Sequence, residues 1–560
     1  MVEKNLLYYG DNLDVLVRHV KDESVDLVYL DPPFKSNQDY NVLFAEHGTK
    51  SAAQIKAFED TWHWDEMAAR AFQETVEQGG RVAQAMLAFR TLVGTSDMLA
   101  YLAMMAPRLI ELRRILKSTG SLYLHCDPTA SHYLKLLLDA VFGPQCFRGE
   151  IIWRRYGAHN DSKGYGRVHD VILFYSRGAS PFFEKQHQPH DAAYIAERFR
   201  FADPDGRRWS EQNLASPNPR PNLTYPFTAK NGVTYDPPPN GWKYTPERMQ
   251  ALDDADRLHY PAKAGGRLRL KNYMDEMPGV PVQDLWIDIG AIGGTSPERL
   301  GYPTQKPEAL LERIISSSCP ASGTVLDPFC GCGTTIAAAQ RLGRRWVGID
   351  ITHLAINLIR HRLRDSYGDG IAKTYRVIGE PTTLDDARQL AADDPYQFQW
   401  WALGLVGARP VEQKKGADKG IDGRIFFHDE PGGKTKQIIL SVKAGNTSVA
   451  HVRDLRGVIE REGAEIGVLL TFQDSTQPMR SEAASAGFYT SPGWHTSHPR
   501  MQVITIEELL AGKTIDYPHV TGTTFKKAPK AAAPTADQAQ LFGSPAAMPD
   551  DEEPDAAAGV

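Results

Sequence analysis

Residues 323–350 constrain the fold of this 560-residue chain more than any other segment. They comprise an apolar stretch ending at Asp327, a turn with Gly331 and Gly333, an alanine-rich run and a second apolar stretch ending at Asp350. Glycines permit a tight turn and close approach of the backbone to a ligand. The pattern predicts strand, turn, helix and strand, in which an acid closing the second strand commonly binds ribose hydroxyls.

A second motif, Asp31-Pro32-Pro33-Phe34, follows the apolar run 25–30. Open α/β sheets place their chemistry at the carboxyl ends of their strands. Proline fixes φ and has no N–H, so this loop is stiff and its carbonyl groups are free to accept hydrogen bonds. An acid with such carbonyls can hold an exocyclic amine, and an aromatic ring can stack on a base. Alone, the motif is equally compatible with an ordinary loop after a strand. The glycine turn, however, supplies the second half of a possible active site.

Strand and helix patterns alternate through residues 1–180 and again through 296–370. Strands are expected at 120–127 and 171–175, with a helix between them at 129–142. This alternation predicts an α/β fold with a doubly wound sheet.

Together the two motifs resemble the S-adenosylmethionine-dependent amino-methyltransferases of DNA. The catalytic motif precedes the cofactor motif, as in the beta-ordered group that includes type III modification subunits. The segment 301–307 is similar to the one this group carries before its cofactor strand. The resemblance implies a Rossmann-like sheet and these cofactor-binding residues: Asp11, Thr304, Gln305, Lys306, Asp327, Pro328, Phe329, Gly331, Gly333, Thr334 and Asp350.

The catalytic residues implied are Asp31, Pro32, Pro33 and Phe34. The target base must be flipped out of double-stranded DNA, and Phe34 would stack on it. Asp31 and the Pro32 carbonyl would accept the amine hydrogens and direct the nitrogen lone pair at the methyl sulfonium. By resemblance, Asp31 and Phe34 favour the N6 amine of adenine, with N4-cytosine as the alternative.

Residues 181–295 break the alternation and are rich in Pro, Gly, Asn, Arg and aromatic residues. Long irregular insertions are usually functional, and the resemblance places target recognition here. Basic residues in and before this insertion suit contacts with phosphates and bases; they are Arg154, Arg155, Lys163, Arg167, Lys243, Arg267, Arg269 and Lys271.

Residues 390–517 are expected to form a second, smaller α/β domain, which begins with an amphipathic helix at 396–403. Asp422 and Lys443 have the layout of PD-(D/E)xK nucleases, in which acids hold a divalent cation and the lysine helps to activate water. The segment resembles the Mrr-type restriction endonuclease domain. Ser441 departs from that pattern, because a hydroxyl is a poor ligand for Mg²⁺. A nuclease with Mg²⁺, a degenerate DNA-binding or structural domain and a plain surface turn all stay open.

Residues 518–560 predict a disordered tail, rich in Ala and Pro. Within it, Gln538–Phe542 resembles the peptide by which bacterial proteins dock on the replication sliding clamp. The net charge of -6 is concentrated in acids near the end of this tail, so DNA binding needs local basic patches. A homodimer is also open.

The five cysteines lack framework spacing, and Cys330 and Cys332 lie inside the glycine turn, so neither disulfides nor a metal are expected there. No signal peptide or membrane-length apolar run is apparent, which predicts a cytoplasmic protein. The resemblance implies a bacterial, nucleoid-associated one.

Three other functions stay open. One is a combined restriction-modification enzyme whose C-terminal domain cuts DNA. Another is a non-enzymatic DNA-binding protein on a dead methyltransferase fold, against which the intact Asp31 and Asp350 argue. The third is methylation of RNA or of protein amides, whose enzymes tend to have Asn where this chain has Asp31.

Overall fold

The computed structural model describes residues 4–33, 64–157, 164–263, 265–302, 304–411, 420–430, 435–518 and 529–530. The chain divides into two compact units. Among the described residues, the first unit lies within 4–184 and 283–530, and the second unit within 185–282.

A nine-stranded sheet in the described part of the chain forms the centre of the first unit. Its strand order is β14-β4-β5-β3-β2-β15-β16-β1-β17. All neighbouring strands are parallel except at β5, which is antiparallel to both of its neighbours. The strands are β1 (Asn5–Tyr9), β2 (Val25–Leu30), β3 (Leu116–Cys126), β4 (Phe147–Arg154), β5 (His169–Ser176), β14 (Leu285–Trp286), β15 (Thr324–Asp327), β16 (Arg345–Asp350) and β17 (Tyr375–Ile378).

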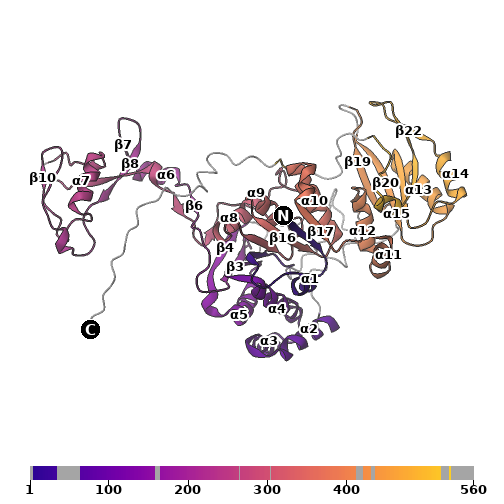
Figure 1. Cartoon of the computed structure of the whole chain (residues 1–560), viewed down its shortest axis with the longest axis horizontal. Helices are drawn as coiled ribbons and strands as arrows, with labels where there is room; N and C mark the ends of the chain where they lie inside the picture. The colour runs from indigo at the N-terminus through magenta and orange to yellow at the C-terminus, as the bar shows by residue number, and fades with distance from the viewer. Residues whose placement is uncertain are drawn as a thin grey trace. The chain divides into compact units, whose positions relative to one another are not determined.

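Helices cover both faces of this sheet, which confirms the doubly wound α/β fold expected from the sequence (Figure 1). Helices α4 and α5 lie on the opposite side from α8, α9 and α10. The helices are α1 (Asn12–His19), α2 (Glu66–Glu77), α3 (Gly80–Val93), α4 (Asp97–Ile115), α5 (Ser131–Phe142), α8 (Glu308–Ser318), α9 (Thr334–Arg341) and α10 (His353–Tyr367), with short 3-10 turns at Pro144–Cys146 and Asp369–Lys373.

Strands β2 and β15 lie side by side although about 300 residues separate them in the sequence. Leu27 pairs with Val325, and Val28 pairs with Leu326. Every residue of β2 is buried, as expected for a strand that is covered on both faces. Because the two strands are parallel, the loop that begins at Asp31 and the glycine turn after Asp327 leave the same edge of the sheet.

The last part of the first unit is a separate five-stranded sheet, in the order β18-β19-β20-β21-β24, with helices against it. This part is called the nuclease-like domain below. Its elements are α11 (Leu384–Asp393), α12 (Pro395–Leu405), β18 (Arg409–Pro410), β19 (Gly423–Phe427), β20 (Lys436–Lys443), α13 (Val449–Glu462), β21 (Ile466–Thr471), α14 (Gln477–Ser485), β22 (Phe488–Thr490), β23 (Ser497–Pro499), β24 (Met501–Thr505) and α15 (Ile506–Leu510).

Helix α12 corrects one expectation from the sequence. The helix expected at 396–403 is present, but it is not amphipathic, because six of its residues are buried and they lie on more than one face. These residues are Gln397, Phe398, Trp400, Trp401, Ala402 and Leu403. A helix that is apolar around most of its circumference packs against protein on several sides.

The second unit has a core of its own, centred on Leu214, Trp242 and Met249. It contains a four-stranded antiparallel sheet in the order β11-β12-β8-β7. Its elements are β6 (His187–Gln188), α6 (Ala192–Arg198), β7 (Phe201–Ala202), β8 (Arg208–Asn213), β9 (Phe227–Thr228), β10 (Thr234–Tyr235), α7 (Pro246–Asp254), β11 (Leu258–His259), β12 (Arg269–Tyr273) and β13 (Val280–Pro281), with 3-10 turns at Pro221–Leu223 and Met274–Glu276. The insertion expected at 181–295 contains the described residues of this unit, 185–282.

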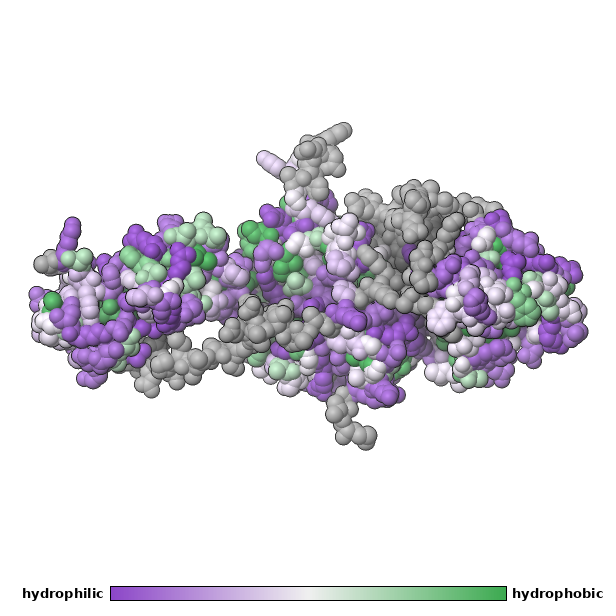
Figure 2. Space-filling view, turned by 90° about the horizontal axis from the view of Figure 1, so that it is seen from above, coloured by the Kyte–Doolittle hydropathy of each residue, from purple (hydrophilic) through white to green (hydrophobic). Residues whose placement is uncertain are grey.

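The face of the molecule in Figure 2 is mostly hydrophilic, and its hydrophobic residues form separate patches. In the described ranges, no helix combines the length and apolar character needed to cross a membrane. The catalytic-motif residue Phe34, the basic residue Lys163 and the proposed clamp peptide 538–542 lie outside the described residues.

Candidate active site

Four neighbouring parallel strands end in acids at one edge of the sheet. Strands β2, β15, β16 and β1 lie in this order, and they lead into or end at Asp31, Asp327, Asp350 and Asp11. The sequence separates these acids widely, whereas the sheet topology brings all four to one edge. This is the edge at which open α/β sheets bind ligands.

Asp31 forms an ion pair with Lys306 through its Oδ2 atom. The two side chains are only 16% and 10% exposed. Lys306 therefore contacts the catalytic motif, although the sequence resemblance assigned it to the cofactor. Pro32 is buried and Pro33 half-buried beside this pair. The ion pair places a cation against one carboxylate oxygen of Asp31, and the second oxygen, Oδ1, is the one left to receive another donor.

The glycine turn has a backbone that only glycine adopts without strain. Gly331 and Gly333 have φ angles of +49° and +74°. A Cβ atom at Gly331 would lie 3.2 Å from the Tyr302 ring, and one at Gly333 would lie 2.6 Å from Cγ1 of Ile359. Both the dihedral angles and the close neighbours require glycine, as the sequence predicted.

Asp350 holds this turn in place. Its Oδ2 accepts the Gly331 N–H at 2.9 Å, and its Oδ1 accepts both the N–H and the hydroxyl of Thr352 at 2.9 Å. Burial raises the pKa of Asp350 to about 6, against the opposing effect of these hydrogen bonds. Burial likewise raises the pKa of Asp327 to about 7, with smaller contributions from Asp31 and Asp350. Burial thus makes the ionised forms of Asp327 and Asp350 costly. A cation or a hydrogen-bond donor bound at this edge would stabilise these ionised forms.

Asp11 caps helix α1 and contacts a residue that the sequence analysis missed. Its Oδ1 accepts the N–H of Leu13 at 2.8 Å, and its Oδ2 accepts Arg108 Nη2 at 2.8 Å. The Asp11 side chain remains 46% exposed. The neighbouring Asn12 donates to the Pro328 carbonyl at 2.8 Å and accepts from Arg108. Asn12 thus joins the end of β1 to the cofactor motif.

The loop before α8 is closed by Gln305. Its side-chain oxygen accepts the Leu300 N–H at 2.8 Å, and its side-chain nitrogen donates to the Glu298 carbonyl at 2.7 Å. The Thr304 carbonyl lies 3.4 Å from the Lys306 ammonium. The part of this segment that the structure describes therefore shapes the loop that presents Lys306.

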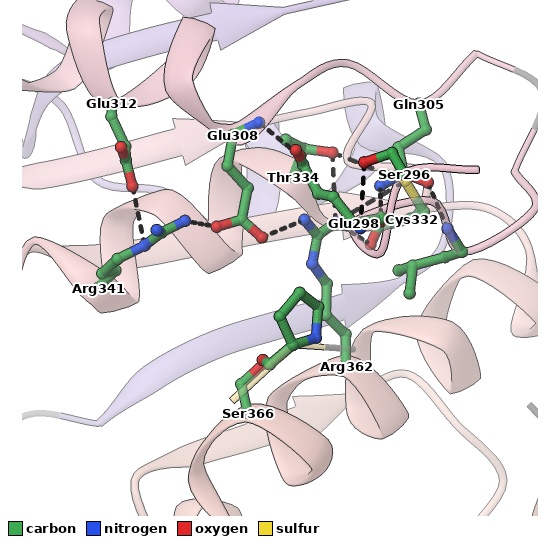
Figure 3. Close-up of polar contacts among 12 residues, drawn as sticks. Ser296, Glu298, Gln305, Glu308, Glu312, Cys332, Thr334, Arg341, Arg362 and Ser366 are labelled. Carbon is green, nitrogen blue, oxygen red and sulfur yellow. Dashed lines mark hydrogen bonds and ion pairs between the residues drawn. The ribbon is translucent and has the colours of Figure 1, made fainter. Parts of the chain in front are cut away.

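A buried ion-pair network lies beneath the glycine turn (Figure 3). Glu308 Oε1 accepts from Arg362 Nη2 at 2.6 Å, and its Oε2 is paired with Arg341. Arg362, whose side chain is 3% exposed, also donates to the Cys332 carbonyl at 3.2 Å and to the Thr334 hydroxyl at 3.3 Å. The network connects the start of α8, two residues after Lys306, to the turn itself.

A chain of polar contacts also runs behind Asp31. The Tyr29 hydroxyl lies 2.8 Å from His125 Nδ1, and His125 Nε2 lies 3.0 Å from the Asp170 carboxylate. Burial would raise the pKa of Asp170, but His125 and the charges of Lys306 and Arg155 outweigh it and lower that pKa. Arg155, expected to contact DNA, donates to Asp170 at 3.1 Å, so one of its nitrogens is engaged within the chain.

In the nuclease-like domain, Asp422 is buried and surrounded by donors. Its Oδ1 accepts Gln399 Nε2 at 3.2 Å. Its Oδ2 accepts the Ser441 hydroxyl at 3.1 Å and the Val442 N–H at 2.6 Å, and lies 3.8 Å from the Lys443 ammonium. The structure does bring the three predicted residues together. Within the ranges described, no group of three or more His, Cys, Asp or Glu residues is arranged to hold a metal ion.

Comparison with known proteins identifies the family. Residues 25–361, more than half of the chain, match the model of the N6 and N4 DNA methylases. The chain belongs to this DNA methylase family. Residues 397–511 match a second model, described as NACHT-associated inactive Restriction Endonuclease 1. The match to the first model contains both the Asp31 motif and the glycine turn.

Among curated relatives, this DNA methyltransferase is 27% identical over 365 residues to the type II methyltransferase M.EcaI of Enterobacter cloacae, covering 65% of this chain and 70% of the relative. It is 27% identical over 353 residues to the Mod subunit of the type III restriction-modification enzyme StyLTI of Salmonella typhimurium, covering 60% of this chain but only 50% of that subunit. A solved structure of the cytosine-N4-specific PvuII DNA methyltransferase aligns with 63% of this chain and 84% of that one, at 14% identity and a TM-score of 0.30.

Proposed function

We propose that this DNA methyltransferase transfers a methyl group from S-adenosylmethionine to the N6 amine of an adenine flipped out of double-stranded DNA. The observation that carries the proposal is the placement of Asp31 beside the glycine turn and Asp350, at the ends of three adjacent parallel strands. Methyl transfer to an amine needs an amine-binding group beside a cofactor site, and adjacent strand ends supply both here.

The residues at this edge fit the cofactor. The turn offers close backbone approach at Gly331 and Gly333, and Asp350 and the half-exposed Asp11 offer carboxylate oxygens for hydroxyl and amine donors. The Ile351 side chain, directly after Asp350, is 54% exposed. An adenine ring bound beside Asp350 would cover this side chain and remove apolar surface from water.

S-adenosylmethionine bound here would supply an electrophilic methyl group on a positively charged sulfur. The chain's own part is to hold the amine. Lys306 occupies Oδ2 of Asp31, so Oδ1 and the Pro32 carbonyl would accept the two amine hydrogens. This keeps the nitrogen lone pair out of conjugation with the ring and pointed at the methyl group. As the N–C bond forms, the methyl–sulfur bond would break and its electron pair would stay on the sulfur, leaving S-adenosylhomocysteine. The surplus proton on the amine would pass to Asp31, the group placed to accept it.

Adenine is preferred over cytosine because position 31 is an acid and position 34 is Phe, the combination expected of N6-adenine enzymes by resemblance. The type III Mod relatives fit this choice. N4-cytosine methylation is the second candidate, since the family as a whole comprises N6 and N4 methylases.

We also propose that the second unit reads the DNA sequence. Lys243 and Arg267 are exposed on it, and Lys243 lies over the Tyr244 ring. Lys271, also expected to contact DNA, is instead paired with Asp203 at 2.8 Å. The sequence-reading surface is therefore expected on the exposed cations rather than on Lys271. Homodimer formation, clamp binding and a cytoplasmic, nucleoid-associated location stay predictions.

The catalytic assignment is tested with Asp31→Ala in the full chain. Methyl transfer to DNA should be lost, while calorimetric binding of S-adenosylmethionine should be retained. Asp14→Ala removes an acid whose side chain is half exposed on α1 and serves as the control with full activity. Retained transfer in Asp31→Ala, or equal loss in Asp14→Ala, would overturn the assignment.

We further infer that the nuclease-like domain does not cleave DNA. Asp422 is buried, its carboxylate accepts three hydrogen bonds within the chain, and Ser441 is no substitute for an acidic ligand. The relevant assay is incubation of unmethylated supercoiled plasmid with the chain and Mg²⁺. Intact plasmid is expected; nicking that disappears in Lys443→Ala would instead establish a combined restriction-modification enzyme.

A further inference from the structure

Helix α12 belongs to the nuclease-like domain. Phe398, Trp401 and Leu403 are part of the core of this domain, packed with residues of its central sheet such as Ile425 and Leu440. The residues that match the inactive endonuclease model also begin in this helix, at position 397. One side of α12 is therefore committed to the domain that does not carry the methyltransferase motifs.

The other side of α12 packs against the cofactor site. Trp400, only 7% exposed, forms a cluster with Cys332, Leu354 and Leu358, and Tyr302 packs against that cluster. Cys332 is the residue between the two glycines of the turn. Trp400 is thus a side chain of the nuclease-like domain that shares a hydrophobic cluster with the turn.

A polar contact beside this cluster reaches the strand ends. Gln397 Oε1 accepts the N–H of His353, the first residue of α10, at 3.3 Å. The buried His353 ring is stacked on Tyr9, with ring centroids 3.7 Å apart. His353 follows Asp350 by three residues, and Tyr9 precedes Asp11 by two. Gln397 therefore contacts the backbone three residues after Asp350, and the His353 ring stacks on the strand end that leads to Asp11.

The fit between α12 and α10 is close. A Cβ atom at Gly404 would lie 2.0 Å from the Asn357 side-chain amide, so any larger residue there would have to displace that side chain. On the same helix, Gln399 donates to Asp422, the former nuclease position. Helix α12 is consequently in contact both with the degenerate nuclease site and with the turn that would hold the cofactor.

We propose that α12 makes the nuclease-like domain a structural component of the methyltransferase, with Trp400 and Gln397 as positioning residues for the cofactor turn and for the first turn of α10. The domain supports methyl transfer instead of cutting DNA. The proposal rests on the proposed cofactor site, because its effect is on S-adenosylmethionine binding.

The test compares two adjacent tryptophans in the full chain. Trp400→Leu should weaken S-adenosylmethionine binding about 2- to 30-fold, the range for residues that couple to a site without touching its ligand. The kcat at saturating S-adenosylmethionine should change little, so the effect lies in KM. Trp401→Leu, the matched control, should lower thermal stability of the nuclease-like domain and leave the affinity unchanged. Trp400→Phe should restore most of the affinity.

Equal affinities in Trp400→Leu and wild type, or equal losses in Trp400→Leu and Trp401→Leu, would overturn the proposal. If Trp400→Leu does not fold, Gln397→Ala replaces it as the test. This variant should bind S-adenosylmethionine more weakly than wild type, and an affinity equal to that of wild type would contradict the proposal. Failure of the wild-type chain itself to bind S-adenosylmethionine would be a failure of the proposed function, and is distinguishable because it needs no variant.

Discussion

Replacement of Glu308 by Gln tests the network beneath the glycine turn. It leaves Arg362, with a side chain only 3% exposed, without its anionic partner. Breaking a buried ion pair by removing one partner costs about 3–5 kcal/mol. Arg341, the second partner, is 35% exposed and adds little, because exposed pairs contribute about 0–1 kcal/mol. Arg362 keeps its bonds to Cys332 and Thr334, so the lower end, about 3 kcal/mol, is expected.

Thermal unfolding followed by circular dichroism should show a melting temperature several degrees below that of wild type. S-adenosylmethionine should also bind more weakly to Glu308→Gln, because Arg362 contacts the turn directly. The double variant Glu308→Gln with Arg362→Met removes the buried charge and should recover much of the lost stability. A wild-type melting temperature in Glu308→Gln, or a double variant whose losses simply add, would refute the reasoning.

Three further predictions concern single groups at the strand ends. Gly333→Ala places a Cβ 2.6 Å from Ile359 at a positive φ, so overpacking of about 1–3 kcal/mol should distort the turn and weaken calorimetric S-adenosylmethionine binding; unchanged binding contradicts this. Hydroxyl groups of the cofactor would donate to an ionised Asp350, whose pKa is about 6, so the affinity for S-adenosylmethionine should fall as the pH drops through that value. Asp350→Asn should flatten the dependence of this affinity on pH, measured from about pH 5 to 8. A pH dependence that the variant leaves unchanged would rule out Asp350 as a cofactor-binding residue. Lys306→Met removes the ion-pair partner of Asp31 and should lower kcat about 10- to 100-fold while cofactor binding is retained. A loss of cofactor binding with unchanged kcat would instead show that Lys306 serves the cofactor.

The sequence was sufficient to predict the doubly wound α/β fold and to find the two motifs that this fold brings to one edge of the sheet. Both motifs are local patterns that a few residues reveal. One is an apolar run that ends in Asp31, and the other is a turn that needs Gly331 and Gly333. The doubly wound arrangement then follows, because parallel strands bring these ends to one edge.

The side chains that contact the motif residues could not be predicted, because they lie far away in the sequence. Lys306 is 275 positions from Asp31, and Arg108 is 97 positions from Asp11. Arg108 and Arg362 occur within helices whose sequences look ordinary. Only the tertiary packing reveals that each one reaches the active-site edge.

Helix α12 was misread for a related physical reason. The sequence predicts an amphipathic helix at 396–403, whereas Trp400 and Trp401 belong to two different hydrophobic clusters. Only a helix packed on both sides buries both rings. The short strands of the second unit, several of two residues, were equally hidden, because so few residues leave no periodic pattern.

The central claim is tested most directly by sequencing modified bases in unmethylated DNA after incubation with the chain and S-adenosylmethionine. The account predicts N6-methyladenine at one recurring sequence, made by the wild-type chain and absent with Asp31→Ala. N4-methylcytosine would contradict the choice of base, and no modified base in DNA that the chain has bound together with S-adenosylmethionine would contradict the proposed reaction.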